Sequence, residues 1–226
     1  MIIGDGMLAS MFIDYKNSNN IIIFASGVSN SSETREKEFL REKTLVENTL
    51  KNYRDKLFIY FSSCSLDDPQ LSNTPYHIHK RNMEQLIKEI SNYYIIFRVP
   101  NIIGRGGNKN TIINFLFNKI KQEEVFDLWI NATRNIVDIE DLYKIVSYII
   151  NNRVFKNIIL NIAYEYNYKV EDIVHAIENI LNKKAKYNII NKGADLKIDI
   201  QKTLPILNEL KIVQPTIETL IKKYKV

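Results

Sequence analysis

Residues 1–27 read MIIGDGMLASMFIDYKNSNNIIIFASG. Strand-like apolar runs alternate with a turn and a helical segment in this stretch, and that order indicates the kind of β-sheet to expect. Two apolar runs, Met1–Ile3 and Ile21–Ala25, enclose a glycine-rich turn and a short helical segment. The continuous second run suits a strand that is buried on both faces of a parallel sheet. Residues 7–20 have room for one crossover helix between two parallel strands. The stretch therefore predicts a strand–helix–strand unit.

The same alternation continues outward along the chain. Leu57–Phe61 and Tyr94–Val99 are further strand-like runs, and long amphipathic helices are expected before them at about Glu33–Arg54 and Thr74–Ile90. This rhythm favours an α/β fold with a parallel sheet. Beyond Pro100 we expect shorter elements: helices at 111–121, 138–151, 170–182, 200–210 and after Pro215, and extended segments at 125–130, 135–137 and 157–162.

Composition narrows the class of protein. The 226 residues are 45% hydrophobic and 25% charged, with 7 Gly and 5 Pro, which is ordinary for a compact globular chain. One cysteine and three histidines argue against a disulfide framework and a zinc site. Asp5 and Asp14 interrupt any leader-like run, and no segment approaches the roughly 20 apolar residues of a membrane span. We therefore expect a cytoplasmic protein without a metal or membrane partner. We also expect no nucleic-acid partner, because the net charge of +5 comes without aromatic–basic interleaving.

The glycine-rich turn has the form Gly4-x-Gly6-x-x-Ala9, between a strand and a helix. In that context the backbone can approach a dinucleotide pyrophosphate at the helix N-terminus, although an ordinary strand-to-helix turn explains two glycines equally well. A complete dinucleotide-binding half continues with a second strand and an acid about 20 residues on. Here only one helix separates Gly6 from Ile21, and Asp14 is expected on that helix. The sequence therefore predicts a phosphate-binding turn without the adenosine half of the site.

Tyr76 and Lys80 are four residues apart, which places them on one face of a predicted helix. A nearby ammonium stabilises phenolate and lowers the tyrosine pKa from its usual value near 10, so that the phenol can act as an acid or base. Ser63, at the end of the preceding strand, could orient a substrate carbonyl or alcohol. In a chain with 13 Tyr, the spacing alone fits a solvated helix face equally well.

The order of these motifs resembles the extended short-chain dehydrogenase/reductase family, especially its nucleotide-sugar epimerases, dehydratases and ketoreductases. The segments that carry the resemblance are, in chain order, Gly4-x-Gly6-x-x-Ala9, Ala25-Ser26-Gly27, Ser62-Ser63, Tyr76-x-x-x-Lys80, Arg98–Gly104, Arg134–Leu142 and Leu210–Pro215. Together they cover nearly the whole chain. The chain is shorter than members of this family commonly are, and the deficit falls mainly between Gly6 and Ile21.

The resemblance implies a reduced Rossmann-type parallel sheet flanked by helices, with a small C-terminal α+β substrate lobe. Residues 1–105 would form the truncated dinucleotide-binding core, and residues 106–226 the remaining core elements and the lobe. It further implies NAD or NADP as cofactor, a nucleotide-linked sugar as substrate, and a homodimer formed through the two long helices.

The implied activity is reduction or epimerisation of a nucleotide-linked (keto)sugar in surface polysaccharide biosynthesis. Dehydration is not implied, because Cys64-Ser65 stands where the sugar dehydratases have an acid pair. The alternative is a degenerate member of the family that binds a nucleotide sugar or a partner enzyme without redox chemistry. Retention of Ser63, Tyr76 and Lys80 favours the enzyme, and loss of the second strand favours the binding protein.

The family's catalytic residues map onto a hydroxyl, a phenol and an ammonium. By resemblance Tyr76 would be the acid/base, and Lys80 would hold the nicotinamide ribose and depress the tyrosine pKa. Ser63 would be the hydroxyl partner, with Ser62 or Ser65 in its place if the register slips.

The family's binding positions map onto both ends of the chain. Ala25–Gly27 would pass beneath the cofactor, and Asn101 and Arg134 would lie near the substrate phosphates, where an arginine can donate two parallel hydrogen bonds. The residues that would face the cofactor pyrophosphate are Gly4, Gly6 and Ala9.

Other noticeable residues are expected to be structural. Cys64 fits a small buried hydrophobe, since it lacks a cationic neighbour in the sequence. Trp129 is expected in the core, and His77 and His79 on different helix faces. Three lysines fit solvated helix ends that the helix dipole favours; these are Lys183, Lys184 and Lys186.

Overall fold

The computed structural model of the chain describes residues 1–106 and 111–225. Its centre is a five-stranded sheet of order β1-β2-β3-β4-β9, in which every neighbouring pair is parallel. The strands are β1 (Ile2–Ile3), β2 (Ile21–Phe24), β3 (Leu57–Ser63), β4 (Tyr94–Val99) and β9 (Ile158–Asn161). The expected α/β fold with a reduced parallel sheet is confirmed.

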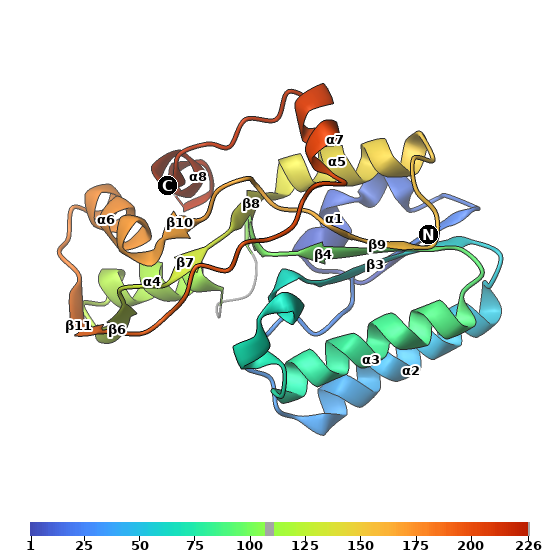
Figure 1. Cartoon of the computed structure of the whole chain (residues 1–226), viewed down its shortest axis with the longest axis horizontal. Helices are drawn as coiled ribbons and strands as arrows, with labels where there is room; N and C mark the ends of the chain where they lie inside the picture. The colour runs from blue at the N-terminus through green and yellow to red at the C-terminus, as the bar shows by residue number, and fades with distance from the viewer. Residues whose placement is uncertain (107–110, 226) are drawn as a thin grey trace.

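Helices cover both faces of this sheet (Figure 1). One face carries α2 (Glu36–Asn52) and α3 (Pro75–Ile90), and the other carries α1 (Met7–Met11), α5 (Ile139–Asn151) and α7 (Leu204–Glu209). Because successive side chains of a strand point to opposite faces, β3 serves both cores. Phe58 and Tyr60 pack with the α2–α3 side, and Ile59 and Phe61 pack with the α1–α5 side.

Strand β1 forms one edge of the sheet. Its residues Ile2 and Ile3 pair with Ile23 and Phe24 of β2, and no described strand lies on its other side. A complete dinucleotide-binding sheet has the order 3-2-1-4-5-6, with the first strand in the interior. Removing strands 2 and 3 from that order leaves 1-4-5-6, which matches β1-β2-β3-β4, and β9 adds a further parallel strand beyond β4. The shortening between Gly6 and Ile21 is thereby explained as the loss of those two strands.

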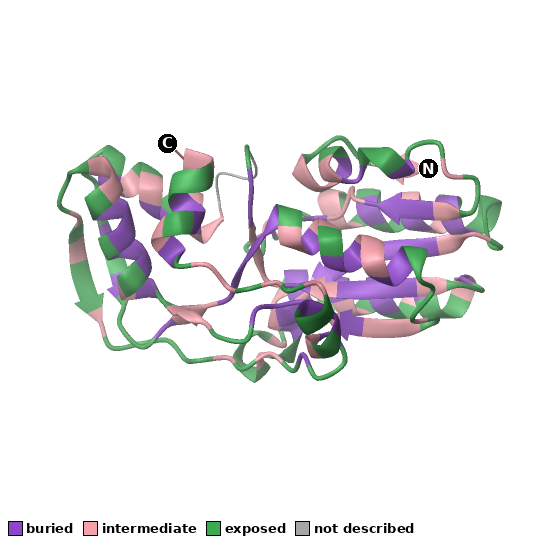
Figure 2. Cartoon of the chain, turned by 90° about the horizontal axis from the view of Figure 1, so that it is seen from above, coloured by how far each residue is buried: buried purple, intermediate pink, exposed green. Residues whose placement is uncertain are grey.

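The chain leaves the end of β4 and builds a smaller lobe around a separate hydrophobic cluster. Figure 2 shows buried residues concentrated both along the central sheet and on the inner helix faces of this lobe. Its elements are β5 (Asn101–Ile103), α4 (Ile112–Lys121), β6 (Val125–Trp129), β7 (Thr133–Arg134), β8 (Ile136–Asp138), β10 (Tyr168–Lys169), α6 (Val170–Leu181), β11 (Lys186–Ile190) and α8 (Ile217–Lys225). In the described part of the chain no helix has the length and apolarity needed to cross a bilayer.

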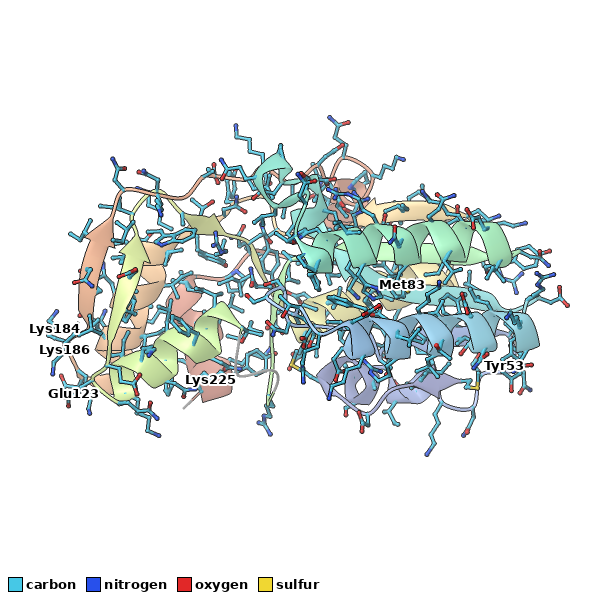
Figure 3. The ribbon with its side chains drawn as sticks, turned by 90° about the horizontal axis from the view of Figure 1, so that it is seen from below. Tyr53, Met83, Glu123, Lys184, Lys186 and Lys225 are labelled. Atoms are coloured by element: carbon cyan, nitrogen blue, oxygen red, sulfur yellow. The ribbon has the colours of Figure 1, made fainter. Side chains whose placement is uncertain are left out.

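Two expectations about the lobe were wrong. Lys186 begins strand β11, which pairs with β6, and is therefore not at a helix end. Lys183 and Lys186 contact Glu123 at 3.0 and 3.4 Å. Figure 3 shows Glu123 and Lys186 at the outer end of the lobe. Trp129 is 44% exposed, because β6 buries only alternate residues and Trp129 lies on the uncovered face.

Candidate active site

The turn after β1 packs directly against the end of β2. Gly4 has φ of +126°, and a Cβ at this position would lie 2.6 Å from the Ala25 carbonyl oxygen. Gly6 faces open space, with nothing within 4 Å of a Cβ built there, whereas Ala9 is buried at 4% exposure. The structure thus brings Gly4, Gly6 and Ala25 together at the carboxyl end of the sheet, where ligands of open α/β sheets bind.

Replacing Gly4 with alanine is expected to lower the free energy of unfolding by about 1–3 kcal/mol, because a side chain at this φ is strained and its methyl group would overlap Ala25. Gly6→Ala is the matched control, with a loss within about 0.5 kcal/mol, since its methyl group would enter open space. Urea unfolding of both variants measures the difference. Equal losses in the two would contradict the backbone conformation described for this turn.

Lys80 lies below the loop that follows β2. Its Nζ donates to Glu42 Oε1 and to the Tyr60 hydroxyl, each at 3.0 Å, and the residue is 2% exposed. A Cβ on Gly27 would lie 2.9 Å from the same Nζ, so glycine allows the loop to cross directly over the ammonium. An ammonium has three donors. Two of them are used in the described structure, and one remains for a group that binds at the loop.

Glu42 of α2 is the centre of this cluster. It accepts hydrogen bonds from the Val28 backbone N at 2.6 Å and the Tyr60 hydroxyl at 2.5 Å, and lies 3.0 Å from His79 Nε2, besides its contact with Lys80. Burial raises the pKa of this carboxyl, but the Lys80 ammonium and the hydrogen bonds outweigh burial and hold the pKa well below its usual range. An ionised carboxylate therefore joins the β2–α2 loop, the sheet and α3.

Tyr76 lies one turn before Lys80 on α3, as the spacing predicts. The Lys80 Nζ is 5.9 Å from the centre of the Tyr76 ring. The ring is buried, at 6% exposure, and within the described residues its hydroxyl makes no hydrogen bond. The phenol is thus packed in place while its polar end has no protein partner there.

Three serines, Ser62, Ser63 and Ser65, lie at or just after the end of β3 and have different surroundings. Ser62 is 4% exposed and donates to Glu84 Oε1 at 2.6 Å, on the α3 side of the sheet. Ser63 and Ser65 are half-buried, and their hydroxyl oxygens are 2.8 Å apart. Cys64 between them is 2% exposed, and burial raises the pKa of its thiol, in agreement with a small buried hydrophobe. The accessible hydroxyls are those of Ser63 and Ser65.

His77 continues this hydroxyl cluster. Its Nε2 lies 2.8 Å from Ser65 Oγ, and its Nδ1 lies 2.5 Å from Oγ1 of Thr74, the N-cap of α3. Burial lowers the pKa of the imidazole, and Arg81 lowers it further. His77 and His79 lie on different helix faces, as expected from the sequence, since His77 contacts Ser65 and His79 contacts Glu42. The contact between His77 and the serines was not expected, because it joins residues on two elements.

The two expected phosphate-binding residues lie where the lobe meets the sheet. Asn101 Nδ2 donates to the Asn135 carbonyl at 3.2 Å, and Arg134 Nη1 donates to the Thr133 carbonyl at 2.7 Å. Burial lowers the pKa of Arg134, and Asp68 opposes that shift. Asp68 acts in the same direction on His77. The Asp68 carboxylate therefore acts both on Arg134 of the lobe and on His77 beside the serine hydroxyls.

A polar cleft of about 250 Å³ opens beside Gly27. Arg41 donates from Nη2 to the Ser26 carbonyl at 3.1 Å and pairs with Glu38 at 3.4 Å. Arg35 pairs with Glu33 at 2.6 Å. The charges that line this cleft are thus neutralised by one another.

The described residues fit one half of a dinucleotide cofactor. The open face at Gly6 and the remaining donor of Lys80 suit a pyrophosphate and a nicotinamide ribose. No described strand beyond β1 carries an acid for the adenosine ribose. Asp14, which follows the turn on the crossover segment, accepts a hydrogen bond from the Tyr143 hydroxyl at 2.7 Å on the α1–α5 side of the sheet.

Comparison with known proteins identifies the family of this chain. The model of the NAD-dependent epimerase/dehydratase family matches residues 8–163, and the chain belongs to that family. No curated protein sequence matches significantly.

Solved structures share the fold at low sequence identity. UDP-glucose 4-epimerase from Bifidobacterium longum, in complex with NAD+ and UDP, superposes with a TM-score of 0.71 at 17% identity, over 96% of this chain and 79% of that one. UDP-glucuronic acid 4-epimerase from Bacillus cereus, in complex with NAD and a fluorinated UDP-sugar, gives 0.74 at 15%, over 96% and 76%. dTDP-glucose 4,6-dehydratase from Bacillus anthracis, in complex with NAD, gives 0.69 at 12%, over 96% and 76%.

Proposed function

We propose that this chain carries out nicotinamide-dependent reduction or epimerisation of a nucleotide-linked sugar. The observation that carries the proposal is the Tyr76 hydroxyl, which has no partner among the described residues, one helical turn from a buried lysine. Three related epimerase structures were determined with NAD, two of them also with UDP or a UDP-sugar, which supports the same cofactor and substrate class here.

Each group has a distinct part in the proposed reaction. When bound, NAD or NADP would accept or return a hydride at the sugar carbon. The turn at Gly4 and Gly6 would take the pyrophosphate, and the third donor of Lys80 would hold the nicotinamide ribose. Tyr76 would take up or return the proton of the sugar hydroxyl. Ser63 would position that hydroxyl.

The substrate would lie between the sheet and the lobe. Arg134 and Asn101 would bind its diphosphate, because the guanidinium remains charged at neutral pH and can donate to two phosphate oxygens at once. The absence of an acidic pair after Ser63 continues to favour ketoreduction or epimerisation over dehydration, since Cys64 and Ser65 occupy those positions.

The setting follows from the resemblance of the chain to sugar-modifying enzymes. We place the reaction in the cytoplasm, in surface polysaccharide biosynthesis. We also propose a homodimer that buries the outer faces of α2 and α3, where Leu40 and Ile78 are 60% and 47% exposed. Sedimentation of the wild-type chain and of the Leu40→Glu variant would test that arrangement, with a monomeric variant as the expected result.

A titration and a turnover assay test the proposed function. The wild-type chain is titrated with NADH and NADPH, followed by ligand fluorescence and thermal shift, and is then assayed with UDP- and dTDP-linked sugars. We expect one dinucleotide to bind and one sugar nucleotide to be converted. If a sugar nucleotide binds while neither dinucleotide binds at millimolar concentration, the redox function fails. The non-redox binding protein, which loss of the adenosine strand favours, then takes its place.

A further inference from the structure

We propose that Glu42 is a positioning residue for the reaction: its carboxylate offsets the charge of the Lys80 ammonium and so sets the pH range in which Tyr76 exchanges its proton. The inference rests on the proposed function, because it concerns the same phenol and the same ammonium. Tyr76 remains the group that takes up and returns the proton of the sugar hydroxyl. Glu42 would act on that step through Lys80.

The Glu42 carboxylate and the Lys80 ammonium form a buried ion pair. Lys80 Nζ lies 3.0 Å from Glu42 Oε1, and the two side chains are 3% and 0% exposed. Water and salt screen such a buried pair much less than a surface pair. Seen from the Tyr76 ring, whose centre is 5.9 Å from Lys80 Nζ, the pair is a dipole and not a free positive charge. The ammonium therefore stabilises a phenolate less than it would without Glu42.

The surroundings of Glu42 keep its carboxylate ionised and fixed. Oε1 also accepts from the Tyr60 hydroxyl, whereas Oε2 accepts from the Val28 backbone N at 2.6 Å and lies 3.0 Å from His79 Nε2. Burial raises the pKa of this carboxyl, but the Lys80 ammonium and the hydrogen bonds outweigh burial and hold the pKa well below its usual range. Glu42 is therefore negative throughout the neutral and alkaline range.

The neighbours from the sheet bring no unpaired charge to the phenol. Tyr60 of β3 is fully buried, and burial together with Glu42 raises the pKa of its hydroxyl well above the usual value, so the hydroxyl stays neutral. Glu84, one turn beyond Lys80 on α3, is paired with Arg98 of β4 at 2.8 Å. The charge that Glu42 carries is thus the one that faces the ammonium directly.

The neighbour of Tyr76 on its own helix is also neutral near neutral pH. The centres of the His77 and Tyr76 rings are 5.2 Å apart. Burial lowers the pKa of the His77 imidazole and Arg81 lowers it further, while Asp68 acts in the opposite direction. The field at the phenol is therefore set mainly by the pair of Lys80 and Glu42.

Glu42 also ties the ammonium to the loop that would pass beneath the cofactor. Its Oε2 holds the Val28 backbone N, and a Cβ on Gly27 would lie 2.9 Å from Lys80 Nζ and 3.0 Å from Glu42 Oε1. Loop, carboxylate and ammonium are therefore packed as one unit. From this position the third donor of Lys80 would reach the nicotinamide ribose.

The direction of the effect follows from the signs of the charges. Oxidation of the sugar hydroxyl uses the phenolate as base, so its rate should rise with pH as Tyr76 loses its proton. Glu42→Gln removes the negative charge and leaves the full charge of the ammonium, which favours the phenolate. We expect the acidic limb of the rate profile to move to lower pH by about one pH unit.

The first test needs neither cofactor nor substrate. The full chain is labelled with ¹³C at the tyrosine ring carbon that bears the hydroxyl and is titrated by NMR, and the Tyr76 signal is the one that Tyr76→Phe removes. In Glu42→Gln this signal should titrate about one pH unit below wild type. Glu47→Gln, which removes a half-buried carboxylate from the same helix, is the matched control and should titrate as wild type. An unmoved Tyr76 signal in Glu42→Gln would overturn the inference.

A double variant keeps the test valid if Glu42→Gln does not fold. That single change leaves the ammonium buried without a counter-charge, whereas Glu42→Gln combined with Lys80→Met removes both charges and leaves neither unpaired. If the carboxylate offsets the ammonium, Tyr76 in the double variant should titrate within about half a pH unit of wild type. A rise of about one pH unit or more would show that the ammonium acts without being offset, and would overturn the inference.

The second test is the pH profile of single-turnover oxidation of a converted sugar nucleotide. The midpoint of the acidic limb in Glu42→Gln should lie about one pH unit below that of wild type. Tyr60→Phe loosens the same cluster but keeps both charges, so it should lose stability and keep the wild-type midpoint. A merely structural role of Glu42 would leave the midpoint unmoved in both variants.

The outcomes separate the inference from the proposed function. A wild-type chain that binds no dinucleotide and converts no sugar nucleotide overturns the proposed function, and the role of Glu42 in that reaction with it. A wild-type chain that turns over, together with an unmoved midpoint in Glu42→Gln, overturns the inference alone. A midpoint that moves to higher pH in this variant contradicts it as well.

Discussion

Replacing Tyr76 with phenylalanine is expected to lower turnover by about 100-fold or more, because the reaction loses the phenol that exchanges the proton of the sugar hydroxyl. The same change should barely affect the fold. The Tyr76 hydroxyl makes no hydrogen bond among the described residues, so its removal leaves no protein group unsatisfied. We expect the free energy of unfolding to change by less than about 0.5 kcal/mol, and cofactor binding to stay nearly intact.

Tyr60→Phe is the matched control on the neighbouring strand. The Tyr60 hydroxyl contacts both Glu42 and Lys80 and is fully buried, so its loss should destabilise the protein by about 1–3 kcal/mol. Urea unfolding and steady-state kinetics of both variants separate the two roles. A Tyr76→Phe variant with near wild-type turnover would show that the phenol takes no part in the chemistry.

Replacing Glu42 with alanine is expected to lower the free energy of unfolding by about 3–5 kcal/mol, because the Lys80 ammonium would be left buried without its counter-charge. Glu42 is 0% exposed, and its four contacts hold the β2–α2 loop, β3 and α3 together. The Val28 backbone N–H would also lose its acceptor. Chemical unfolding measures the loss.

Glu47→Ala on the same helix is the control. Glu47 is half-buried, and its Oε1 lies 3.9 Å from Lys43 Nζ. Its removal should therefore lower the free energy of unfolding by less than about 1 kcal/mol. Similar losses in the two variants would contradict the central position of Glu42. In that case the cluster would not be what joins α2 to α3.

The Glu42 cluster also sets a pH dependence. Because the pKa of Glu42 in the folded chain lies below its unfolded value of 4.5, the unfolded state binds more protons as the pH falls. The stability from Glu42 is therefore fully present above about pH 4.5 and is lost as the pH falls toward the folded pKa. Glu42→Gln, which cannot ionise, should flatten this acid limb of the stability curve. An unchanged limb in the variant would show that other carboxyls cause it.

The central sheet could be predicted because each of its longer strands is an apolar run followed or preceded by a helix. The lobe was less predictable. Residues 186–190 form a strand that pairs with residues 125–129, about 60 positions away, and the local sequence does not indicate that partner. Trp129 was misplaced for a related reason, since burial of an isolated strand pair depends on which of its faces another element covers.

The site was predictable where the motif is local and hidden where it depends on packing. The placement of Tyr76 and Lys80 on one helix face follows from their spacing of four residues. Glu42 lies in a charged helix and looks like a solvated residue by type. Its position one turn before buried Val46 placed it on the buried side of α2, and this was the signal that could have revealed it.

The most direct measurement compares the binding of NADH with that of its two halves, reduced nicotinamide mononucleotide and ADP-ribose, by calorimetric titration of the wild-type chain. The central claim concerns a family member that lacks strands 2 and 3 of the complete dinucleotide-binding sheet. We propose that such a chain still holds the nicotinamide side of the cofactor at Lys80 and Gly27. We therefore expect the mononucleotide to bind within about tenfold of NADH, a difference of about 1.4 kcal/mol, and ADP-ribose to bind much more weakly than either. Tight binding of ADP-ribose with no binding of the mononucleotide would contradict that claim.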